Sequence, residues 1–222
     1  MNVPNLESIS ETNGINFLSH KDKKIYSVGI STGGLAEIKM AKAQSARHVI
    51  ATTIDPKGAE HAKHRIKELG FSDQIDIKIE DVSQQLPYPN DHFDYIYARL
   101  ILHYLTKDAL ASALAELHRV LRTNGRIFVV VRSTDCPEAR NAAKFDAVTC
   151  LTTYSSGKES YSRYFHTQES ISHYLSQAGF TIEHMAAYQE HLCVDFQRTL
   201  PASQIDSLIE VLATKEDQPL RG

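Results

Sequence analysis

Short hydrophobic runs separated by turn residues recur along the chain, and they predict buried strands. Five such runs start at Lys24 and His48 or cover residues 75–79, 93–97 and 127–131. Apolar residues on both faces of such short segments are typical of strands in a parallel sheet.

Between these runs, hydrophobic residues recur at steps of three and four, which predicts amphipathic helices. The pattern is strongest at residues 110–121, with Asn124 and Gly125 as its expected stop, and it recurs over 35–43, 57–69 and 168–178. Strands that alternate with helices predict right-handed crossovers and a parallel sheet covered on both faces.

The pattern changes after Gly179. Residues 180–188 and 191–199 have the pattern of two consecutive strands, which predicts an edge hairpin with residues 192–199 as an antiparallel strand. Residues 203–214 carry a stripe of helical period, which predicts a final helix packed on the sheet or on a second subunit of a homodimer. A helix is also expected within residues 135–150, and residues 1–22 are expected to form a tail with one docked turn or a small lid.

Composition narrows the function classes. The 222 residues are 42% hydrophobic with a net charge of -3, which suits one domain over residues 1–222 and gives no basic block for nucleic acid. Three scattered cysteines predict no disulfide framework and a cytoplasmic location. No run approaches the ~20 apolar residues of a membrane span. His61 and His64 lack a third ligand nearby, so no metal site is expected.

Five short motifs follow one another in an order typical of one enzyme family. They are Asp81, Leu86-Pro87-Tyr88-Pro89, Phe93-Asp94, His103-Tyr104-Leu105 and Arg119-Val120-Leu121. This ordered set resembles the class I S-adenosylmethionine-dependent methyltransferases, most closely the small-molecule, type 11-like group, over about residues 24–132. The resemblance implies a doubly wound, Rossmann-like, seven-stranded sheet, mostly parallel with one antiparallel strand. It also implies S-adenosylmethionine as cofactor and methyl transfer to a small-molecule acceptor.

The resemblance further implies a cofactor site at the strand ends. Its members would be Gly29, Ile30, Ser31, Gly33, Asp55, Pro56, Asp81, Val82, Arg99 and Leu100. In the family, the acid at Asp55 binds the ribose hydroxyls, and the positions of Asp81 and the Val82 amide contact adenine. The structural alternatives are a helix N-cap for Asp55 and a turn acid for Asp81.

Two departures from the family loop leave the function open. Ser27 stands where the family has an acid near the methionine ammonium group, and Ser31 stands at its second glycine. They favour, as an alternative, a non-catalytic methyltransferase-fold binding or scaffold protein. If the pocket is kept, Ser27→Asp is expected to tighten cofactor binding. A hydride-transfer enzyme would also suit the glycine loop and Asp55, but the expected hairpin argues against it.

The acceptor side is expected beyond the fourth and fifth strands. Residues 133–167 are a candidate substrate cap, with a plain surface loop as the alternative. Any proton would be taken by His103 or His166, and the substrate-lining candidates are Tyr104, Tyr154, Tyr161 and Tyr164. For the residues at 103 and 104, a packing role is the alternative.

Overall fold

Seven strands form one sheet in the order β3-β2-β1-β4-β5-β10-β9. The computed structural model describes residues 8–217 except 31–32, 143, 157–158 and 194–203. The strands are β1 (Lys24–Ser27), β2 (His48–Thr53), β3 (Ile75–Ile79), β4 (Phe93–Arg99), β5 (Leu121–Arg132), β9 (Phe180–Glu190) and β10 (Asp206–Lys215). Strands β1 to β5 pair in parallel, and β10 is antiparallel to both of its neighbours, which confirms the predicted fold class.

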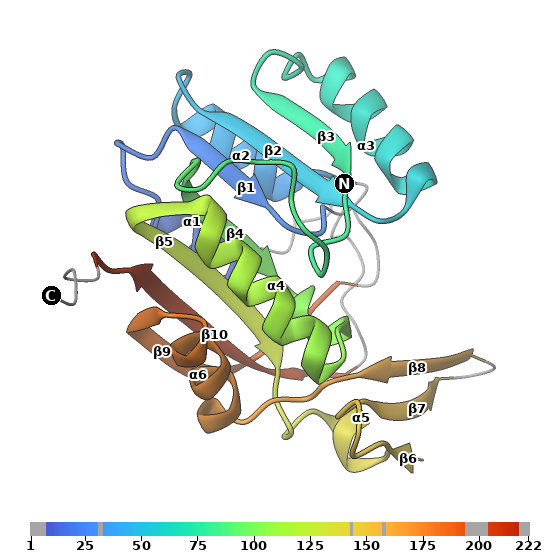
Figure 1. Ribbon diagram of the computed structural model, residues 1–222. Coiled ribbons are helices and arrows are strands. Elements are labelled where there is room, and N and C mark those ends of the chain that lie inside the picture. The colour runs from blue at the N-terminus through green and yellow to red at the C-terminus, as the bar shows by residue number, and fades with distance from the viewer. Residues whose placement is uncertain (1–7, 31–32, 143, 157–158, 194–203, 218–222) are drawn as a thin grey trace, which may run out of the picture.

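Helices cover both faces of the sheet (Figure 1). They are α1 (Ile9–Asn16), α2 (Leu35–Ala43), α3 (Pro56–Glu68), α4 (Lys107–Val120) and α6 (Gln168–Gln177), with a short 3₁₀ turn η1 (Leu102–Tyr104). Leucines of α4 and α6, such as Leu114 and Leu175, pack into one core. Ile38 of α2 and Ile66 of α3 pack into the core on the opposite face. The buried stripe predicted for each helix therefore has the sheet as its partner.

The N-terminal segment forms a helix that presses onto the sheet. Ser8 caps α1 by accepting the Glu11 amide at 3.2 Å, and Tyr95 of β4 donates its hydroxyl to the Gly14 carbonyl at 2.7 Å. A Cβ on Gly14 would lie 2.5 Å from Phe128, so only glycine permits this approach. The segment is thus more ordered than the predicted tail, at least from Ser8 onward.

The predicted C-terminal helix over residues 203–214 is wrong, because its described part is strand β10. Leu208 and Leu212 enter one core, whereas Ile209 and Val211 enter the core on the other face. A strand buried on both faces has hydrophobic residues at steps of one, two, three and four, so it also satisfies a helical pattern. The hydrophobic stripe is buried in the two cores of the sheet, so it gives no support to a homodimer.

The predicted antiparallel strand over residues 192–199 is misplaced, since β10 has that role. Leu192 and Cys193 lie outside the strands of the sheet, and residues 194–199 fall outside the described part of the chain. The expected stop of α4 at Asn124 is also wrong. The helix ends at Val120, and Asn124, with φ of 59°, lies within β5.

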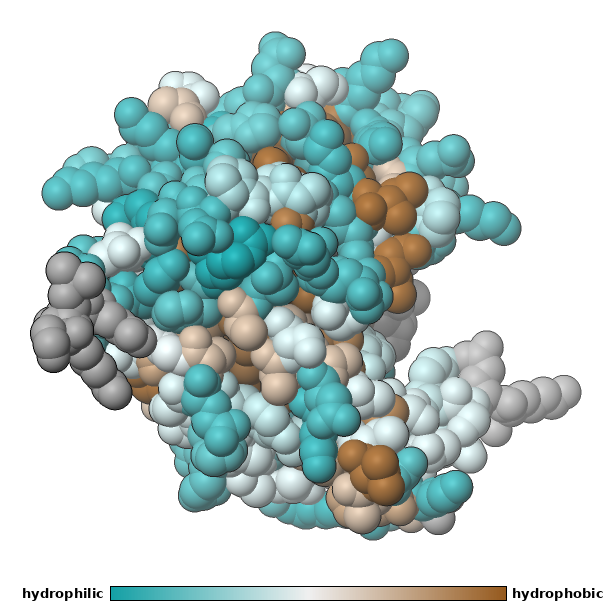
Figure 2. Space-filling view, viewed as in Figure 1, coloured by the Kyte–Doolittle hydropathy of each residue, from teal (hydrophilic) through white to brown (hydrophobic). Residues whose placement is uncertain are grey.

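Within residues 135–150, the described positions contain one short helix, α5 (Pro137–Arg140). A second, antiparallel sheet follows, made of β6 (Lys144–Phe145), β7 (Thr152–Ser156) and β8 (Glu159–Arg163). It projects from one end of the main sheet (Figure 1). Figure 2 shows a brown hydrophobic patch low on the right, near α5 and β6. Phe145 of β6 and Val148, three residues after it, are both exposed. Among the described residues, none of the helices is long and apolar enough to cross a lipid bilayer.

Candidate functional site

The carboxyl ends of β1, β2, β3 and β4 meet at one edge of the sheet, where ligands bind in open α/β folds. Backbone hydrogen bonds continue past the ends of the strands and fix the first loop. The Val28 amide donates to the Tyr97 carbonyl at 2.8 Å, and the Ile30 amide donates to the Thr52 carbonyl at 2.7 Å. The loop after β1 is therefore held between its two neighbouring strands.

Position 29 requires a glycine. Its φ is 77°, and an added Cβ would lie 2.6 Å from the side chain of Ile101. The positive φ and the close approach explain why glycine stands at the first position of the loop. Gly33 is buried and accepts a hydrogen bond at 3.0 Å from Arg65 of α3. Ser31 lies outside the described residues.

A small cavity of about 190 Å³ opens at this edge. It is lined by Glu11, Ser27, Val28, Gly29, Ala36, Glu37, Tyr97, Arg99 and Leu100. The structure thus brings together three of the predicted cofactor residues, Gly29, Arg99 and Leu100. Complete small-molecule sites usually measure roughly 300–1,000 Å³, so this cavity suits one end of a larger ligand.

Charged side chains of both signs line the cavity. Glu37 is 3% exposed and accepts a hydrogen bond from the Ser27 hydroxyl at 2.6 Å. Glu11 is also buried, and it binds the Lys39 ammonium group at 2.9 Å. Arg99 donates from Nε to the Ser10 hydroxyl at 2.7 Å. The helices α1 and α2 therefore bring carboxylates to the cavity, and Arg99 brings a guanidinium group to it.

Leu100, which ends the β4 segment, has a strained backbone. Its φ is 57°, although it is not glycine, and its amide donates to the Val130 carbonyl at 2.8 Å. A non-glycine residue in the left-handed region costs of order 1–3 kcal/mol and tends to occur at functional sites. This left-handed conformation turns the chain away from β4 at the rim of the cavity.

Two predicted cofactor acids lie further along the same edge. Asp55 caps α3, accepting the Lys57 and Gly58 amides at 3.0 Å each. Asp81 forms a turn in which it accepts the Ser83 amide at 2.9 Å, and the adjacent Val82 is buried. Both carboxylates are exposed and can accept further hydrogen bonds. The structural alternatives are therefore present, and they do not exclude ligand binding.

The exposed apolar side chains beside these acids are a separate feature of the edge. Ile54 is 74% exposed directly before Asp55, and Ile79 is 55% exposed near Asp81. Pro56 follows Asp55 as an exposed first residue of α3. Hydrophobic residues at the ends of two neighbouring strands offer a flat apolar surface next to two acids.

The predicted bases are buried away from this cavity. His103 is 1% exposed, and burial, followed by nearby Arg132 and Arg163, holds its pKa well below the usual range. His166 is fully buried, which lowers its pKa to about 3, and its Nδ1 lies 3.2 Å from the Ser170 hydroxyl. Both rings are neutral and packed, so the structure places them as core residues.

Two of the four predicted substrate tyrosines contact one cation, and a third stacks on one of them. The Arg163 guanidinium lies 5.3 Å from the Tyr104 ring centroid and 5.4 Å from that of Tyr154. Tyr161 stacks on Tyr154 at a centroid distance of 5.8 Å. Tyr164 lies apart, with its ring 4.1 Å from that of His166.

An ion-pair network joins the small sheet to the main one. Arg132 of β5 contacts both Glu138 and Asp206, and Arg163 of β8 also reaches Glu138 at 3.5 Å. Cys136, Glu138 and Asp206 lie close enough to bind a metal ion, but the two guanidinium groups already neutralise the carboxylates. The cluster is therefore better described as a salt-bridge network than as a metal site.

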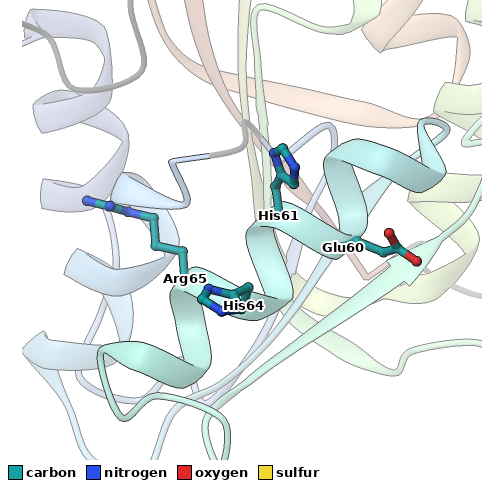
Figure 3. A pocket seen from close by; sticks show the side chains of 4 residues that line it. All are labelled: Glu60, His61, His64 and Arg65. Atoms are coloured by element: carbon teal, nitrogen blue, oxygen red, sulfur yellow. The ribbon is translucent and has the colours of Figure 1, made fainter.

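A broader groove of about 540 Å³ lies over α3 (Figure 3). It is lined by Glu60, His61, His64 and Arg65, whose side chains point in different directions from one helix. Both histidines are exposed, and His64 approaches Glu68 at 3.4 Å. Side chains that diverge from a single helix do not converge on a ligand, which fits their interpretation as surface residues.

Sequence reasoning missed the residues that α1 and α2 contribute to the cavity. Glu11 lies in the segment expected to be a tail, and Glu37 lies ten positions after Ser27 on a helix. The only signal for Glu37 was an acid on the mostly apolar helix that follows the glycine loop. No local pattern shows that this acid turns back towards β1.

Comparisons with known proteins agree with the fold. Residues 25–125 match a protein-family model described as a methyltransferase domain. The chain is 28% identical over 99 residues to an uncharacterized methyltransferase of Synechocystis sp., covering 45% of this chain and 42% of that protein. It is 28% identical over 116 residues to the ubiquinone/menaquinone biosynthesis C-methyltransferase UbiE of Psychromonas ingrahamii, covering 51% and 44% respectively. This chain therefore spans less than half the length of these curated relatives.

A solved structure extends the likeness beyond the matched segment. The SAM-dependent methyltransferase from Methanosarcina mazei is similar with a TM-score of 0.76 at 15% identity. The similarity covers 91% of this chain and 96% of that chain. At this identity the likeness concerns the fold, and it covers more of the chain than the sequence match does.

Proposed function

We propose that this chain is a class I S-adenosylmethionine-dependent methyltransferase, which transfers a methyl group from S-adenosylmethionine to a small-molecule acceptor. The match of residues 25–125 to a methyltransferase domain and the seven-stranded fold support this proposal. The cavity at the carboxyl edge of β1 and β4 carries the proposal. Gly29 lines it with backbone atoms alone, and Glu37 and Arg99 offer charges of both signs. These features fit the zwitterionic amino-acid end of the cofactor.

The nucleoside end would extend along the strand edge. We assign Asp55 to the ribose hydroxyls, and Asp81 with the Val82 amide to the adenine ring. Exposed Ile54 and Ile79 support this assignment, because a planar base gains by covering apolar side chains. The loop residues Ile30 and Gly33 and the helix start at Pro56 would complete the pocket.

When bound, the cofactor supplies a methyl group that its sulfonium charge has already activated. The chain then has to orient the acceptor and exclude water, which is a task of positioning. Helix α1 covers the cavity from one side through Glu11, and β4 ends in the strained turn at Leu100 on the other. No dedicated nucleophile is required.

The acceptor would lie between the end of β4 and the small sheet of residues 144–163. Tyr104 and Tyr161 are partly exposed there, and Arg163 with Tyr154 supports them from below. We propose these residues, with Tyr164, as the acceptor side, and residues 133–167 as its cap. His103 and His166 are unsuited as bases in this conformation, because both are enclosed and resist protonation.

The cysteines bear on location. Cys136 and Cys150 form no disulfide, which favours a reducing compartment, and we propose the cytoplasm on that basis.

Calorimetric titration with S-adenosylmethionine and S-adenosylhomocysteine tests the cofactor, and transfer of a labelled methyl group to a panel of small molecules tests the reaction. We expect binding of both compounds and label transfer to at least one acceptor. Gly29→Val should abolish binding, because its side chain would strike Ile101. Cofactor binding without transfer across a broad panel would instead favour the non-catalytic interpretation, and lack of binding by the folded protein would reject both.

A further inference from the structure

Glu80 lies between the end of β3 and Asp81, and two phenols hold its carboxylate. The Tyr26 hydroxyl donates to Oε2 at 2.8 Å, and the Tyr88 hydroxyl donates to Oε1 at 2.6 Å. Tyr26 is fully buried in β1, and Tyr88 packs against the same core from the connection between β3 and β4. The carboxylate therefore joins three segments of the chain next to the nucleoside end of the proposed site.

The two phenols keep their protons, so they act as fixed donors. Burial first, and then the charge and hydrogen bond of Glu80, raises the pKa of both Tyr26 and Tyr88 well above the usual range. Each ring also lies 4.9 Å from the Phe93 ring centroid, which restricts its movement. Hydrogen bonds to an ionised carboxylate are shorter and stronger than those between neutral groups. Glu80 is therefore held more firmly than an ordinary half-buried side chain.

Backbone and turn contacts fix Asp81 on both sides of its position in the chain. The Glu80 amide donates to the Thr53 carbonyl of β2 at 3.1 Å, and the Gln84 amide donates to the Asp81 carbonyl at 3.0 Å. Ser83 donates to Asp81 Oδ1 from its amide at 2.9 Å and from its hydroxyl at 2.8 Å. Asp81 thus uses one carboxylate oxygen within the turn, and the other can accept a hydrogen bond from a ligand at the exposed edge.

We propose that Glu80 is a positioning residue, which fixes the direction of the Asp81 carboxylate and so makes the site selective for adenine over hypoxanthine. The inference rests on the proposed function, in which Asp81 faces the adenine ring. The 6-amino group of adenine donates a hydrogen bond to a carboxylate, whereas the 6-oxo group of hypoxanthine is itself an acceptor and is repelled. A polar group rejects the wrong ligand strongly when it is held in one place, because it cannot turn away from the mismatch.

The test compares S-adenosylhomocysteine with S-inosylhomocysteine, which carries hypoxanthine in place of adenine. Calorimetric titrations would use the natural chain, Tyr88→Phe, and Tyr26→Phe with Tyr88→Phe, each with and without Asp81→Ala. Tyr188→Phe is the matched control, because it removes a phenol that donates to Glu210 at 2.6 Å on the opposite side of the sheet order from β3. Urea unfolding of each variant shows that it is folded.

We expect the natural chain to bind S-adenosylhomocysteine at least about tenfold more tightly than S-inosylhomocysteine. The double tyrosine change should lower this ratio by about three- to tenfold, mainly through weaker binding of the adenine compound, and Tyr88→Phe alone should lower it less. Tyr188→Phe should leave the ratio unchanged. With Asp81→Ala present, the tyrosine changes should have no further effect on the ratio, because they act through that carboxylate.

A purely structural role for Glu80 predicts a different result, in which the folded double variant weakens both compounds equally or neither. That result, or a natural chain that does not distinguish the two bases, means that the inference is wrong while the proposed function stands. A ratio that still falls in the Asp81→Ala background also overturns the inference. If the natural chain binds neither compound, the proposed function fails and the inference fails with it.

Discussion

Two regions of this molecule use buried ionisable groups in opposite ways. At the carboxyl edge of β1, the carboxylates of Glu11 and Glu37 border a cavity together with Arg99. At the junction with the small sheet, the imidazoles of His103 and His166 are enclosed in packed side chains. In the first region, charge lies next to space that a ligand can occupy. In the second, burial suppresses charge.

The difference shows why burial alone does not identify a catalytic group. A neutral, packed histidine contributes volume and ring contacts, as His166 does against Tyr164. A buried carboxylate beside a cavity can retain its charge, because a donor such as Ser27 supports it and a cationic ligand can complete it. Whether a buried ionisable group borders a cavity therefore distinguishes a binding role from a packing role more clearly than its residue type does.

The largest effect is expected where the junction does contain charge. Asp206→Ala should lower the free energy of unfolding by about 3 kcal/mol, because among the described residues it leaves the largely enclosed Arg132 with Glu138 alone as an anionic partner. Urea denaturation measures the change. Asp135→Ala removes an exposed partner of Arg140 and should cost at most about 0.5 kcal/mol. Equal effects for the two variants would show that the junction network is not a structural element.

The pH dependence of stability sharpens the contrast for His166. Its folded pKa of about 3 lies below the roughly 6.5 of an unfolded histidine, so the unfolded chain binds the proton first as pH falls. From pH 7 to pH 5 this group alone should cost the folded state about 2 kcal/mol. His166→Leu should remove that part of the loss, as measured by urea unfolding at both pH values.

An exposed histidine provides the control for this measurement. His61→Leu, at an exposed position of α3, is the control for the replacement of a histidine by leucine. If His166→Leu keeps the full loss between pH 7 and pH 5, His166 can be protonated in the folded protein, and its role as a base returns.

The smallest effect on binding is expected from Asp55→Asn. Asp55 lies at the same edge of the sheet as the cavity. Asp55→Asn keeps an acceptor for the cap of α3 but removes the negative charge, so it should weaken S-adenosylmethionine binding by about 1 kcal/mol with little change in stability. Asp55→Ala should weaken binding by about 1–3 kcal/mol and destabilise the fold by about 1 kcal/mol through loss of the cap. Calorimetry and urea unfolding separate the two effects. Unchanged affinity in both variants would mean that Asp55 serves the helix alone.

Much of the first half of the fold could be predicted because its signals are local. The helix predicted over residues 35–43 and the strand predicted over 75–79 coincide with α2 and β3. The mistakes fall where the signal is ambiguous. Residues 206–215 are hydrophobic at both odd and even positions. Without knowledge of its neighbours, such a segment fits either a helix or a strand that is buried on both faces.

The sequence by itself determined the alternation of strands and helices, the glycine-rich turn after β1, and the acids that follow β2 and β3. These features depend on spacing and backbone conformation within a few residues. Only the tertiary structure decided that β10 enters the sheet, that His103 and His166 are enclosed, and that Glu37 stands beside Ser27. Each of these facts depends on how separate helices and strands pack against one another. The side-chain contacts that result join residues far apart in the sequence, and no local pattern of hydrophobic residues predicts them.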